Sequence, residues 1–322
     1  MFYLKEKPRL KFAATRDGFG EGLLEAGKKN KKIVALSADL TESTRCLPFK
    51  NKFPERFIQL GVSEQSMASI AAGLSLGGKI PFITSYAVFS PGRNWEQIRT
   101  CLALQKSNVK IVGSHAGLNV GADGASHQGL EDIALTRVLP GMTILVPCDV
   151  FEAKKATLAA AKIVGPVYLR LSREASPVFT KPTASFKVGV AEIFRPGKDA
   201  TIIAAGPIVY EALKAAENLS KKNKLNVRVI NCHTIKPLDV KTILAAAKQT
   251  GAVVTAEEHM VAGGLGSAIA ELLAENYPVP MEFIGVKDTF GESGQPQELM
   301  EKYGLTAKYI ERAILRVIKR KK

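Results

Sequence analysis

Short apolar runs typical of strands alternate with helix-like stretches along almost the whole chain, and this alternation constrains the fold more than any other feature. From the amino end, the pattern predicts a helix over residues 15–29, a strand over 33–39 and a second helix over 64–77. Units of this kind pair their strands in parallel and cover both sheet faces with helices. The sequence therefore predicts an α/β protein with doubly wound, largely parallel sheets.

The alternation stops once and then starts again, which indicates two domains. Residues 174–188 (EASPVFTKPTASFKV) contain two prolines and have no clear period. A chain of 322 residues is also about twice the length of a typical domain. We expect one domain over residues 1–178, a linker over 179–192 and a second domain over 193–322.

The other predicted elements follow the same period. Strands are expected at 80–85, 109–114, 143–148, 166–172, 200–206, 226–232, 251–257 and 281–286. Helices are expected at 92–105, 128–138, 151–164, 207–222, 239–249 and 264–276, with a last one from about 306.

The composition excludes several classes of protein. Hydrophobic residues make up 46% and charged residues 23%, which is typical of a soluble globular protein. No apolar run approaches the roughly 20 residues that span a bilayer, and the charged start has no signal-peptide core. We therefore expect no membrane contact and a cytoplasmic location. The four cysteines have no paired spacing, so we expect reduced thiols and no metal site.

The net charge of +15 predicts anionic partners. Such a balance attracts nucleic acid, phosphorylated metabolites or an acidic partner subunit. The lysines, however, occur in short clusters near 28–32, 221–224 and 319–322, which is the pattern of a solvated surface. We therefore do not expect nucleic-acid binding.

Two glycine-rich segments imitate phosphate-binding motifs and fail. Residues 73–79 (GLSLGGK) fit a P-loop, but Ile80 stands where Ser or Thr must hold magnesium. The segment follows a helix and precedes a strand, the reverse of the required order, and fits a helix C-cap turn better. Residues 263–273 (GGLGSAIAELL) lack the third small residue of a dinucleotide fingerprint. We interpret them as a helix start with exposed amides.

The informative residues lie between Ser37 and Arg173. Glu64 begins a helix of small and apolar residues, and the aromatic pair Tyr86 and Phe89 follows the next strand. Two histidines, His115 and His127, bracket a glycine-rich loop that contains Asp123. Because active sites of α/β proteins form where strands end, this grouping favours chemistry over a purely structural role.

Together these segments resemble the pyrimidine-binding domain of transketolases. The resemblance rests on ATR (14–16), SADLTES (37–43), GVSEQ (61–65), the Tyr86/Phe89 pair, the block 114–147 and YLRLSR (168–173). The second half resembles the C-terminal domain of the same family through HTIKPLD (233–239), TAEEH (255–259), GGLGSAIAELL (263–273) and FGESG (290–294). The resemblance covers almost the whole chain, and it implies an enzyme that transfers a two-carbon ketol group between sugar phosphates with thiamine diphosphate.

The resemblance also implies which residues contact the cofactor. Glu64 matches the glutamate that hydrogen-bonds N1′ of the aminopyrimidine and so helps to activate C2. Phe89 matches the ring that stacks on the pyrimidine, with Tyr86 in the same pocket. Asp39 matches a position near the thiazolium ring. Many family members carry a third aromatic residue where this chain has Gly92.

The substrate contacts are implied in the same way. His127 corresponds to a catalytic residue near the C1 hydroxyl and carbonyl of the donor, and Asp123 to one that binds the C2 hydroxyl of the acceptor. The group that holds the sugar phosphate corresponds to Arg16, Ser43, His115 and Arg173. Guanidinium groups pair bidentately with phosphate oxygens, which makes such a group a sound phosphate clamp.

One expected part of the enzyme is absent from this sequence. Transketolases hold the diphosphate and Mg²⁺ through a GDG motif and a later Asn in a separate N-terminal domain. The segment 121–124 (GADG) is followed by no Asn within thirty residues. The chain thus resembles the C-terminal subunit of a split transketolase. This implies an N-terminal partner that holds Mg²⁺, and a heterotetramer with two copies of each chain around a two-fold axis.

Three other functions stay open at this point. The β subunit of a thiamine-dependent 2-oxoacid dehydrogenase has nearly this length and domain order, but its substrates carry no sugar phosphate. Half of a deoxyxylulose-phosphate synthase is another possibility, although that enzyme is normally one fused chain. A non-catalytic basic assembly or nucleic-acid protein is the fourth reading, which the joint presence of Glu64, Asp123, His127 and Arg173 disfavours.

Overall fold

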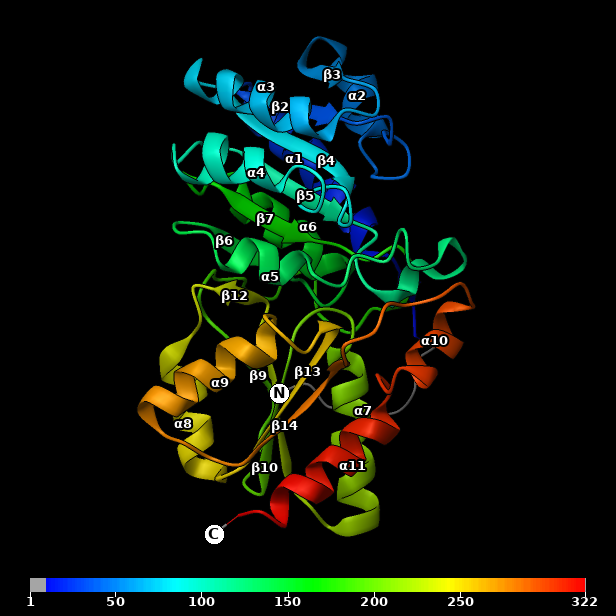
Figure 1. Cartoon of the computed structure of the whole chain (residues 1–322), viewed down its shortest axis with the longest axis vertical. Coiled ribbons are helices and arrows are strands. Elements are labelled where there is room, and N and C mark those ends of the chain that lie inside the picture. Colours follow the sequence, from blue (N-terminus) through cyan, green and yellow to red (C-terminus); the bar gives the residue numbers. More distant parts are fainter. Residues whose placement is uncertain (1–9, 322) are drawn as a thin grey trace.

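The computed structural model describes residues 10–321 and shows two α/β bodies stacked along the long axis (Figure 1). Each body has its own mainly parallel sheet with helices on both faces, so the predicted fold class is confirmed. No helix in this range is long and apolar enough to cross a membrane.

The first body contains a seven-stranded sheet in the order β12-β6-β7-β5-β4-β2-β3. Its strands are β2 (Ile33–Ser37), β3 (Phe57–Gln59), β4 (Ile80–Tyr86), β5 (Lys110–Ser114), β6 (Thr143–Leu145), β7 (Val167–Arg170) and β12 (Thr234–Lys236). Strands β2 to β7 are parallel, whereas β12 runs antiparallel to β6. The edge strand β12 of this sheet therefore comes from the second half of the chain.

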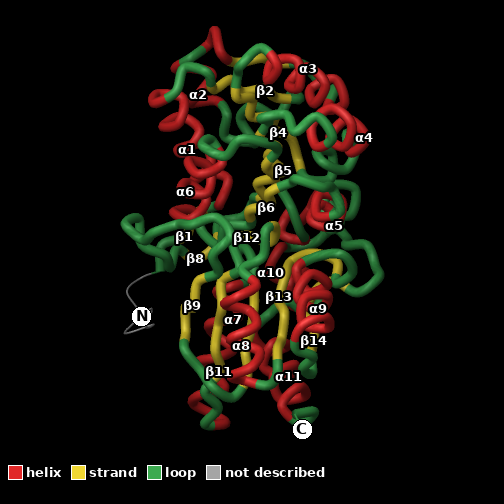
Figure 2. The backbone as a smooth tube through the Cα atoms, turned by 90° about the vertical axis from the view of Figure 1, so that its left-hand side faces the viewer, coloured by secondary structure: helices red, strands yellow, loops and turns green. Residues whose placement is uncertain are grey.

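Helices cover both faces of this sheet (Figure 2). One face carries α1 (Thr15–Lys29), α2 (Leu47–Lys52) and α6 (Val150–Ala160); the other carries α3 (Glu64–Leu76), α4 (Trp95–Gln97), a π-helix (Ile98–Ala103) and α5 (Asp132–Arg137). Two short 3₁₀ helices span Pro54–Arg56 and Leu118–Asp123. Helix α1 packs directly on α6 at Gly18, where a Cβ atom would lie 2.0 Å from the Val150 carbonyl oxygen. The glycine therefore sets the close approach of these helices.

The second body contains a five-stranded sheet in the order β14-β13-β10-β11-β9, in which only β9 is antiparallel. Its strands are β9 (Glu192–Arg195), β10 (Ala200–Ala204), β11 (Val227–Asn231), β13 (Val253–Met260) and β14 (Met281–Val286). The helices are α7 (Val209–Asn223), α8 (Val240–Thr250), α9 (Leu265–Asn276), α10 (Pro296–Lys302) and α11 (Ala307–Ile318). A small antiparallel pair, β1 (Phe12–Ala13) and β8 (Ser176–Pro177), lies beside the junction.

Most predicted helices and strands are present, with shifted ends. The predicted helix over 128–138 is shortened to α5, and the predicted strand over 143–148 ends at Leu145. Residues 128 and 129, at the start of the predicted helix, instead bond to other loops: Gln128 Nε2 donates to the Glu292 carbonyl oxygen, and Gly129 O accepts from Gly117 N. Seven strands and α-helices were not predicted, namely β1, β3, β8, β9, β12, α2 and α10, and neither were the two 3₁₀ helices.

A buried ionic cluster joins the two bodies. Arg170 Nε lies 2.7 Å from Asp132 Oδ2, and its Nη2 donates to the Glu258 carbonyl oxygen in β13. Tyr168 donates to the same Asp132 oxygen over 2.6 Å. Across the junction, His259 Nε2 accepts a hydrogen bond from Ile133 N. Asp132 and Arg170 are 1% and 6% exposed, so their charges depend on each other and on these bonds.

Candidate active site

The predicted site residues gather where the parallel strands β2, β4, β5 and β7 end. Glu64 is the first residue of α3, Tyr86 is the last residue of β4, and His115 directly follows β5. The carboxyl ends of parallel strands meet at one edge of a sheet, where α/β proteins place their ligands.

The carboxylate of Glu64 is buried and oriented by its neighbours. Its side chain is 2% exposed, and Oε1 accepts a 2.9 Å hydrogen bond from Ser85 Oγ. The side-chain amide of Asn94 donates to the Glu64 carbonyl oxygen and to Ser90 Oγ. The other residues of helix α3 are mostly small or apolar, so Glu64 is the one carboxylate of this helix. The hydrogen bond from Ser85 fixes its orientation near the end of β4.

Aromatic rings form a cluster next to this carboxylate. Tyr86 stacks on His115 with ring centroids 3.8 Å apart, and lies nearly parallel to Phe89 at 6.1 Å. His127 meets Phe89 edge to face at 5.5 Å. The residue at 92 must be glycine in this backbone, because a Cβ atom there would lie 2.0 Å from the Val88 carbonyl oxygen. This backbone therefore leaves no room for a third aromatic side chain at position 92.

Arg16 and His115 meet at the centre of the predicted phosphate clamp. Arg16 Nη1 lies 3.2 Å from His115 Nε2 and donates to the Ser43 carbonyl oxygen over 3.0 Å. Since a guanidinium only donates, His115 Nε2 is the acceptor, and Nδ1–H points to Ser114 Oγ at 2.8 Å. Burial, together with Arg16, Arg173 and Arg45, lowers the pKa of His115 to about 3. His115 is therefore neutral in the clamp.

Arg173 reaches the clamp from the end of β7. Its Nη1 donates to the Val120 carbonyl oxygen and lies 3.3 Å from Asp123 Oδ2. Its backbone N–H donates to Asn119 Oδ1, which fixes the turn after the strand. The positive charge of Arg173 also helps to lower the pKa of Arg16, although burial is the largest cause. Arg16, Ser43, His115, Asp123 and Arg173 are thus neighbours.

Asp39 is less closely connected to these groups. It is exposed and left-handed, with φ of 61°, and its backbone N–H donates to Gln59 Oε1. No contact from Asp39 to another predicted site residue is found among residues 10–321. The structure adds two residues that the sequence reasoning missed: Ser85, which binds Glu64, and Arg45, which faces Arg16 and pairs with Asp17 at 2.7 Å. Ser85 could have been found as a polar residue at the end of an apolar strand.

The expectation of exposed amides at the start of α9 is wrong. Glu257, buried in β13, accepts hydrogen bonds from Leu265 N at 2.7 Å and Gly266 N at 2.8 Å. The helix start therefore binds a carboxylate of its own chain. Burial raises the pKa of Glu257 to about 7 despite these bonds.

Other potential ligand sites are sparse in the described part of the chain. His233 and His259 are buried and bonded within the protein, and the four cysteines are free thiols. No group of three or more His, Cys, Asp or Glu within residues 10–321 could hold a metal ion.

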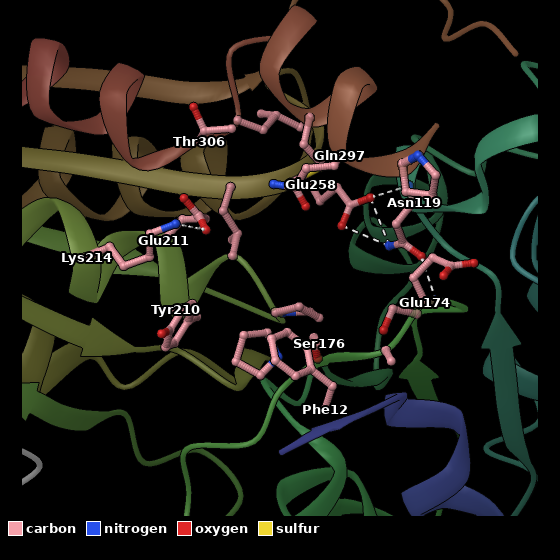
Figure 3. A pocket seen from close by; sticks show the side chains of 18 of the residues that line it. Phe12, Asn119, Glu174, Ser176, Tyr210, Glu211, Lys214, Glu258, Gln297 and Thr306 are labelled. Atoms are coloured by element: carbon pink, nitrogen blue, oxygen red, sulfur yellow. Dashed lines mark hydrogen bonds and ion pairs between the residues drawn. The ribbon is translucent and has the colours of Figure 1, made fainter. Parts of the chain in front are cut away.

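A cavity of about 280 Å³ lies between the two bodies, away from the Glu64 site (Figure 3). Phe12 and Tyr210 line it, and Glu258 and Asn119 lie side by side in its wall. Asn119 Nδ2 donates to both Glu258 oxygens, at 2.9 and 3.0 Å. Asn119 therefore links this junction to Arg173.

Comparison with known proteins identifies the family. Residues 11–178 match the transketolase pyrimidine-binding domain, and residues 189–310 match the transketolase C-terminal domain. A putative transketolase C-terminal section from Methanocaldococcus jannaschii is 43% identical over 312 residues, which are 96% of this chain and 98% of that protein. A 6-deoxy-6-sulfo-D-fructose transketolase subunit from a Clostridium species is 43% identical over 306 residues, 95% of each chain.

A solved structure is similar over nearly its whole length. It is described as a split-gene transketolase in an inactive β4 tetramer, with a TM-score of 0.90, 47% identity, and coverage of 96% of this chain and 99% of that one. The chain belongs to the transketolase family, as its C-terminal section. The predicted family is thus confirmed, and the dehydrogenase and synthase alternatives lose their support.

Proposed function

We propose that this chain is the C-terminal subunit of a two-chain transketolase that moves a two-carbon ketol group between sugar phosphates. The observation that carries the proposal is the joint presence, at one sheet edge, of the buried Glu64 carboxylate and the Arg16–His115–Arg173 group. The family implies dependence on thiamine diphosphate, which supplies a carbon nucleophile that can attack a ketose carbonyl.

The residues at the site fit the aminopyrimidine end of that cofactor. Glu64 is nearly inaccessible, yet Ser85 is the one hydrogen-bond donor to its side chain among residues 10–321. The second carboxyl oxygen of Glu64 would form a hydrogen bond to a ring nitrogen of the aminopyrimidine and share a proton with it. Phe89 would provide the stacking surface, since offset aromatic pairs contribute about 0.5–1.5 kcal/mol beyond burial. Tyr86 would complete the apolar wall.

The chain's own polar groups fit an anionic sugar. Arg16 Nε is buried and has no partner among the described residues, so a phosphate oxygen would satisfy it. Arg173 would turn from Asp123 to the phosphate, which would free Asp123 for a sugar hydroxyl. His127, half-buried beside Phe89, would bind the hydroxyl and carbonyl oxygens near the reacting carbon. Asp39 would lie towards the thiazolium ring.

We further propose that sugar phosphates, and not sulfonated sugars, are the substrates. One relative is named for a sulfonated sugar, so membership in the family does not decide the substrate. The clamp, however, brings the guanidinium groups of Arg16, Arg45 and Arg173 around a neutral His115. Such an excess of positive charge suits the doubly charged phosphate better than the singly charged sulfonate.

We also propose that catalysis requires an N-terminal subunit. The described part of this chain has no group of three or more His, Cys, Asp or Glu that could hold a metal ion such as the Mg²⁺ of a magnesium–diphosphate head. In a two-chain enzyme these contacts come from the partner, and two copies of each chain would form a closed two-fold assembly. Alone, the chain would bind the cofactor weakly and leave the site open to water.

The test is to co-express the chain with an N-terminal transketolase subunit that carries the GDG motif. Transfer from xylulose 5-phosphate to ribose 5-phosphate is then measured for the complex and for each chain alone. We expect turnover by the complex only. Submicromolar cofactor binding or turnover by this chain alone would contradict the half-enzyme proposal, and an inactive, correctly assembled complex would contradict the substrate assignment.

Glu64→Gln tests the role of Glu64 in the assembled complex, and Glu96→Gln serves as its control. The amide fills the same space but cannot share a proton with the aminopyrimidine, so turnover should be lost while the melting temperature stays unchanged. Glu96→Gln, at an exposed position on α4, should leave turnover unchanged. Activity of Glu64→Gln within a few-fold of wild type would refute the role of Glu64.

A further inference from the structure

The N-terminal ends of the parallel strands of the first sheet form a strongly basic surface. The candidate active site lies at the opposite, C-terminal ends of the same strands. Strands β2, β4, β5 and β7 start in register there, with Ile33 paired to Ile80, Phe82 to Lys110, and Lys110 to Val167. The loops before these strands, together with the last two residues of α1, cover residues 28–32, 77–79, 104–109 and 161–166. They carry seven exposed lysines and no carboxylate: Lys28, Lys29, Lys31, Lys32, Lys79, Lys106 and Lys162. Lys29 pairs with Glu25 of α1 at 2.7 Å, whereas the other six form no ion pair among residues 10–321. We call this surface the basic edge.

Large aliphatic side chains stand exposed beside these lysines. Leu76 is 85% exposed, Leu104 70%, Val138 68% and Val164 86%. Each follows or ends a helix that leads to the basic edge. Lysines at helix C-termini are explained by the helix dipole, but the dipole does not explain exposed Leu and Val at the same ends. Exposed apolar side chains close to charged ones are typical of an interaction site.

The basic edge also contains a preformed hollow. A pocket of about 300 Å³ is floored by apolar residues, with two cationic side chains at its border; it is lined by Arg99, Ala103, Leu104, Lys106, Leu139, Pro140 and Gly141. Its size suits one aliphatic side chain and part of the backbone next to it. The hollow would give a ligand an apolar anchor, with cations placed to pair with acidic groups on either side.

Internal hydrogen bonds hold these loops in place. The buried Lys110 donates through Nζ to Asn108 Oδ1 at 2.6 Å, Ile163 O at 2.7 Å and Gly165 O at 2.8 Å. Asn108 N in turn donates to Ser75 Oγ at 2.8 Å, which ties α3 to the same group. A surface fixed in this way loses little conformational freedom on binding.

We propose that the basic edge is a docking site for an acidic segment of another protein, with an aliphatic side chain of that segment seated in the hollow. The excess of positive charge on the loops favours an anionic partner. Stacking of nucleic-acid bases uses aromatic side chains, and these four loops contain none. A membrane-surface helix presents one continuous apolar face, whereas here the exposed aliphatic residues lie on separate segments, and one of them, Leu104, lines the hollow. The site is independent of the proposed catalysis, because it lies at the opposite ends of the strands.

The test measures binding and not turnover. The probe is a fluorescein-labelled peptide of glutamates with a leucine at every third position, followed by fluorescence anisotropy. The edge variant combines Lys32→Glu, Lys79→Glu, Lys106→Glu and Lys162→Glu. The matched control reverses four exposed lysines elsewhere, Lys222, Lys241, Lys287 and Lys319, and so has the same net charge. We expect the edge variant to weaken binding at least about tenfold and the control less than about threefold.

A second arm tests the hollow. Leu104→Ser should weaken binding by roughly three- to tenfold at any salt concentration. Leu104→Ser should not weaken the binding of a peptide whose leucines are replaced by serine. Both substitutions remove the same contact between Leu104 and a peptide leucine, so their effects should not add. If the glutamate substitutions prevent folding, the same four lysines are changed to glutamine, and the expected loss is about half as large on a logarithmic scale.

Equal weakening in the edge variant and the control would overturn the proposal, because net charge alone would then account for the binding. Vesicles of phosphatidylserine and a short duplex DNA are measured in parallel. Binding of either one that depends on the four edge lysines, with no such dependence for the peptide, would assign the surface to a membrane or to nucleic acid and would also overturn the proposal.

Discussion

Ser85 Oγ donates a 2.9 Å hydrogen bond to Glu64 Oε1, and both side chains are buried. Ser85 lies near the end of β4, whereas Glu64 opens α3, so the strand and the helix together set the angle of the carboxylate. A buried carboxylate with a single side-chain donor is sensitive to the loss of that donor. We therefore regard Ser85 as a positioning residue for Glu64.

Ser85→Ala is expected to lower kcat of the assembled enzyme while leaving KM for a phosphorylated donor nearly unchanged. Removing one partner of a buried hydrogen bond costs about 1–3 kcal/mol, which corresponds to a loss of roughly 5- to 150-fold. Ser85→Thr keeps the hydroxyl group and should restore most of the rate. Steady-state kinetics provide the measurement, because a positioning role lowers kcat, leaves KM nearly unchanged and is rescued by Ser85→Thr.

Thr84→Val is the matched control for Ser85. Thr84 is equally buried in β4, but its hydroxyl bonds to Leu36 O and lies near Cys46, away from Glu64. Loss of the Thr84 hydroxyl should reduce stability without lowering kcat. If both variants lower kcat to the same extent, Ser85 acts only through the packing of β4.

Arg173→Ala should raise KM for phosphorylated sugars by about ten- to a hundredfold and leave the unphosphorylated donor hydroxypyruvate nearly unaffected. The reason is the loss of a charge-assisted hydrogen bond worth about 1.5–3 kcal/mol. Steady-state assays with both donors separate the two effects. Arg312→Ala, at an exposed position on α11, should change neither value. Equal losses with both donors would mean that Arg173 supports only the loop at Val120.

The sequence predicted the positions of the candidate site residues in the fold better than it predicted the edge strands of the sheets. Glu64, Tyr86 and His115 follow or precede strong periodic segments, so local pattern and family resemblance place them correctly at strand ends. Strand β12 has only three residues and pairs with β6 of the other body. Its existence depends on how the two bodies dock, which no local pattern contains. Ser85 was missed for a similar reason, since its role depends on a neighbour 21 residues away in the sequence.

Glycine-rich segments show a second limit of local patterns. The GGLG start of α9 has the sequence of an anion site, but the anion is the carboxylate of Glu257 from β13. A motif states which geometry the backbone can adopt, whereas burial and neighbouring strands decide what fills it. By contrast, the failed P-loop at 73–79 was correctly interpreted as a turn, with Gly78 at φ of 79° after α3.

Asp132→Asn is expected to lower the free energy of unfolding by about 3–5 kcal/mol. The change removes the charge that balances the buried guanidinium of Arg170, and an uncompensated buried charge is strongly destabilising. Glu271→Gln offers a matched control, because it weakens the more exposed Arg137–Glu271 pair and should cost less than about 1 kcal/mol. Urea unfolding checks both variants. Equal, small losses would show that the Asp132–Arg170 pair does not help to hold the two bodies together.

His233 should make the protein less stable in acid. It is buried, stacks on Phe186 with centroids 4.2 Å apart, and places Nδ1 2.9 Å from Thr234 Oγ1. Burial lowers its pKa in the folded protein to about 4, with a smaller contribution from Lys155, against about 6.5 in the unfolded chain. Between these values the unfolded chain binds a proton that the folded protein does not. Stability contributed by His233 therefore falls as pH falls from 6.5 to 4.

His233→Gln removes this dependence, so the stability difference between wild type and variant should shrink as the pH is lowered from 7 to 5. The limiting slope is about 1.4 kcal/mol per pH unit below 6.5, which gives a change of up to about 2 kcal/mol. Urea unfolding of both proteins at each pH provides the measurement. Burial raises the pKa values of Glu152 and Glu257 to about 7, so these two groups disfavour the folded state as pH rises. Both proteins share this opposite trend, and it cancels in the difference between their stabilities. A difference that stays constant from pH 7 to pH 5 would show that His233 is protonated equally in the folded and unfolded states.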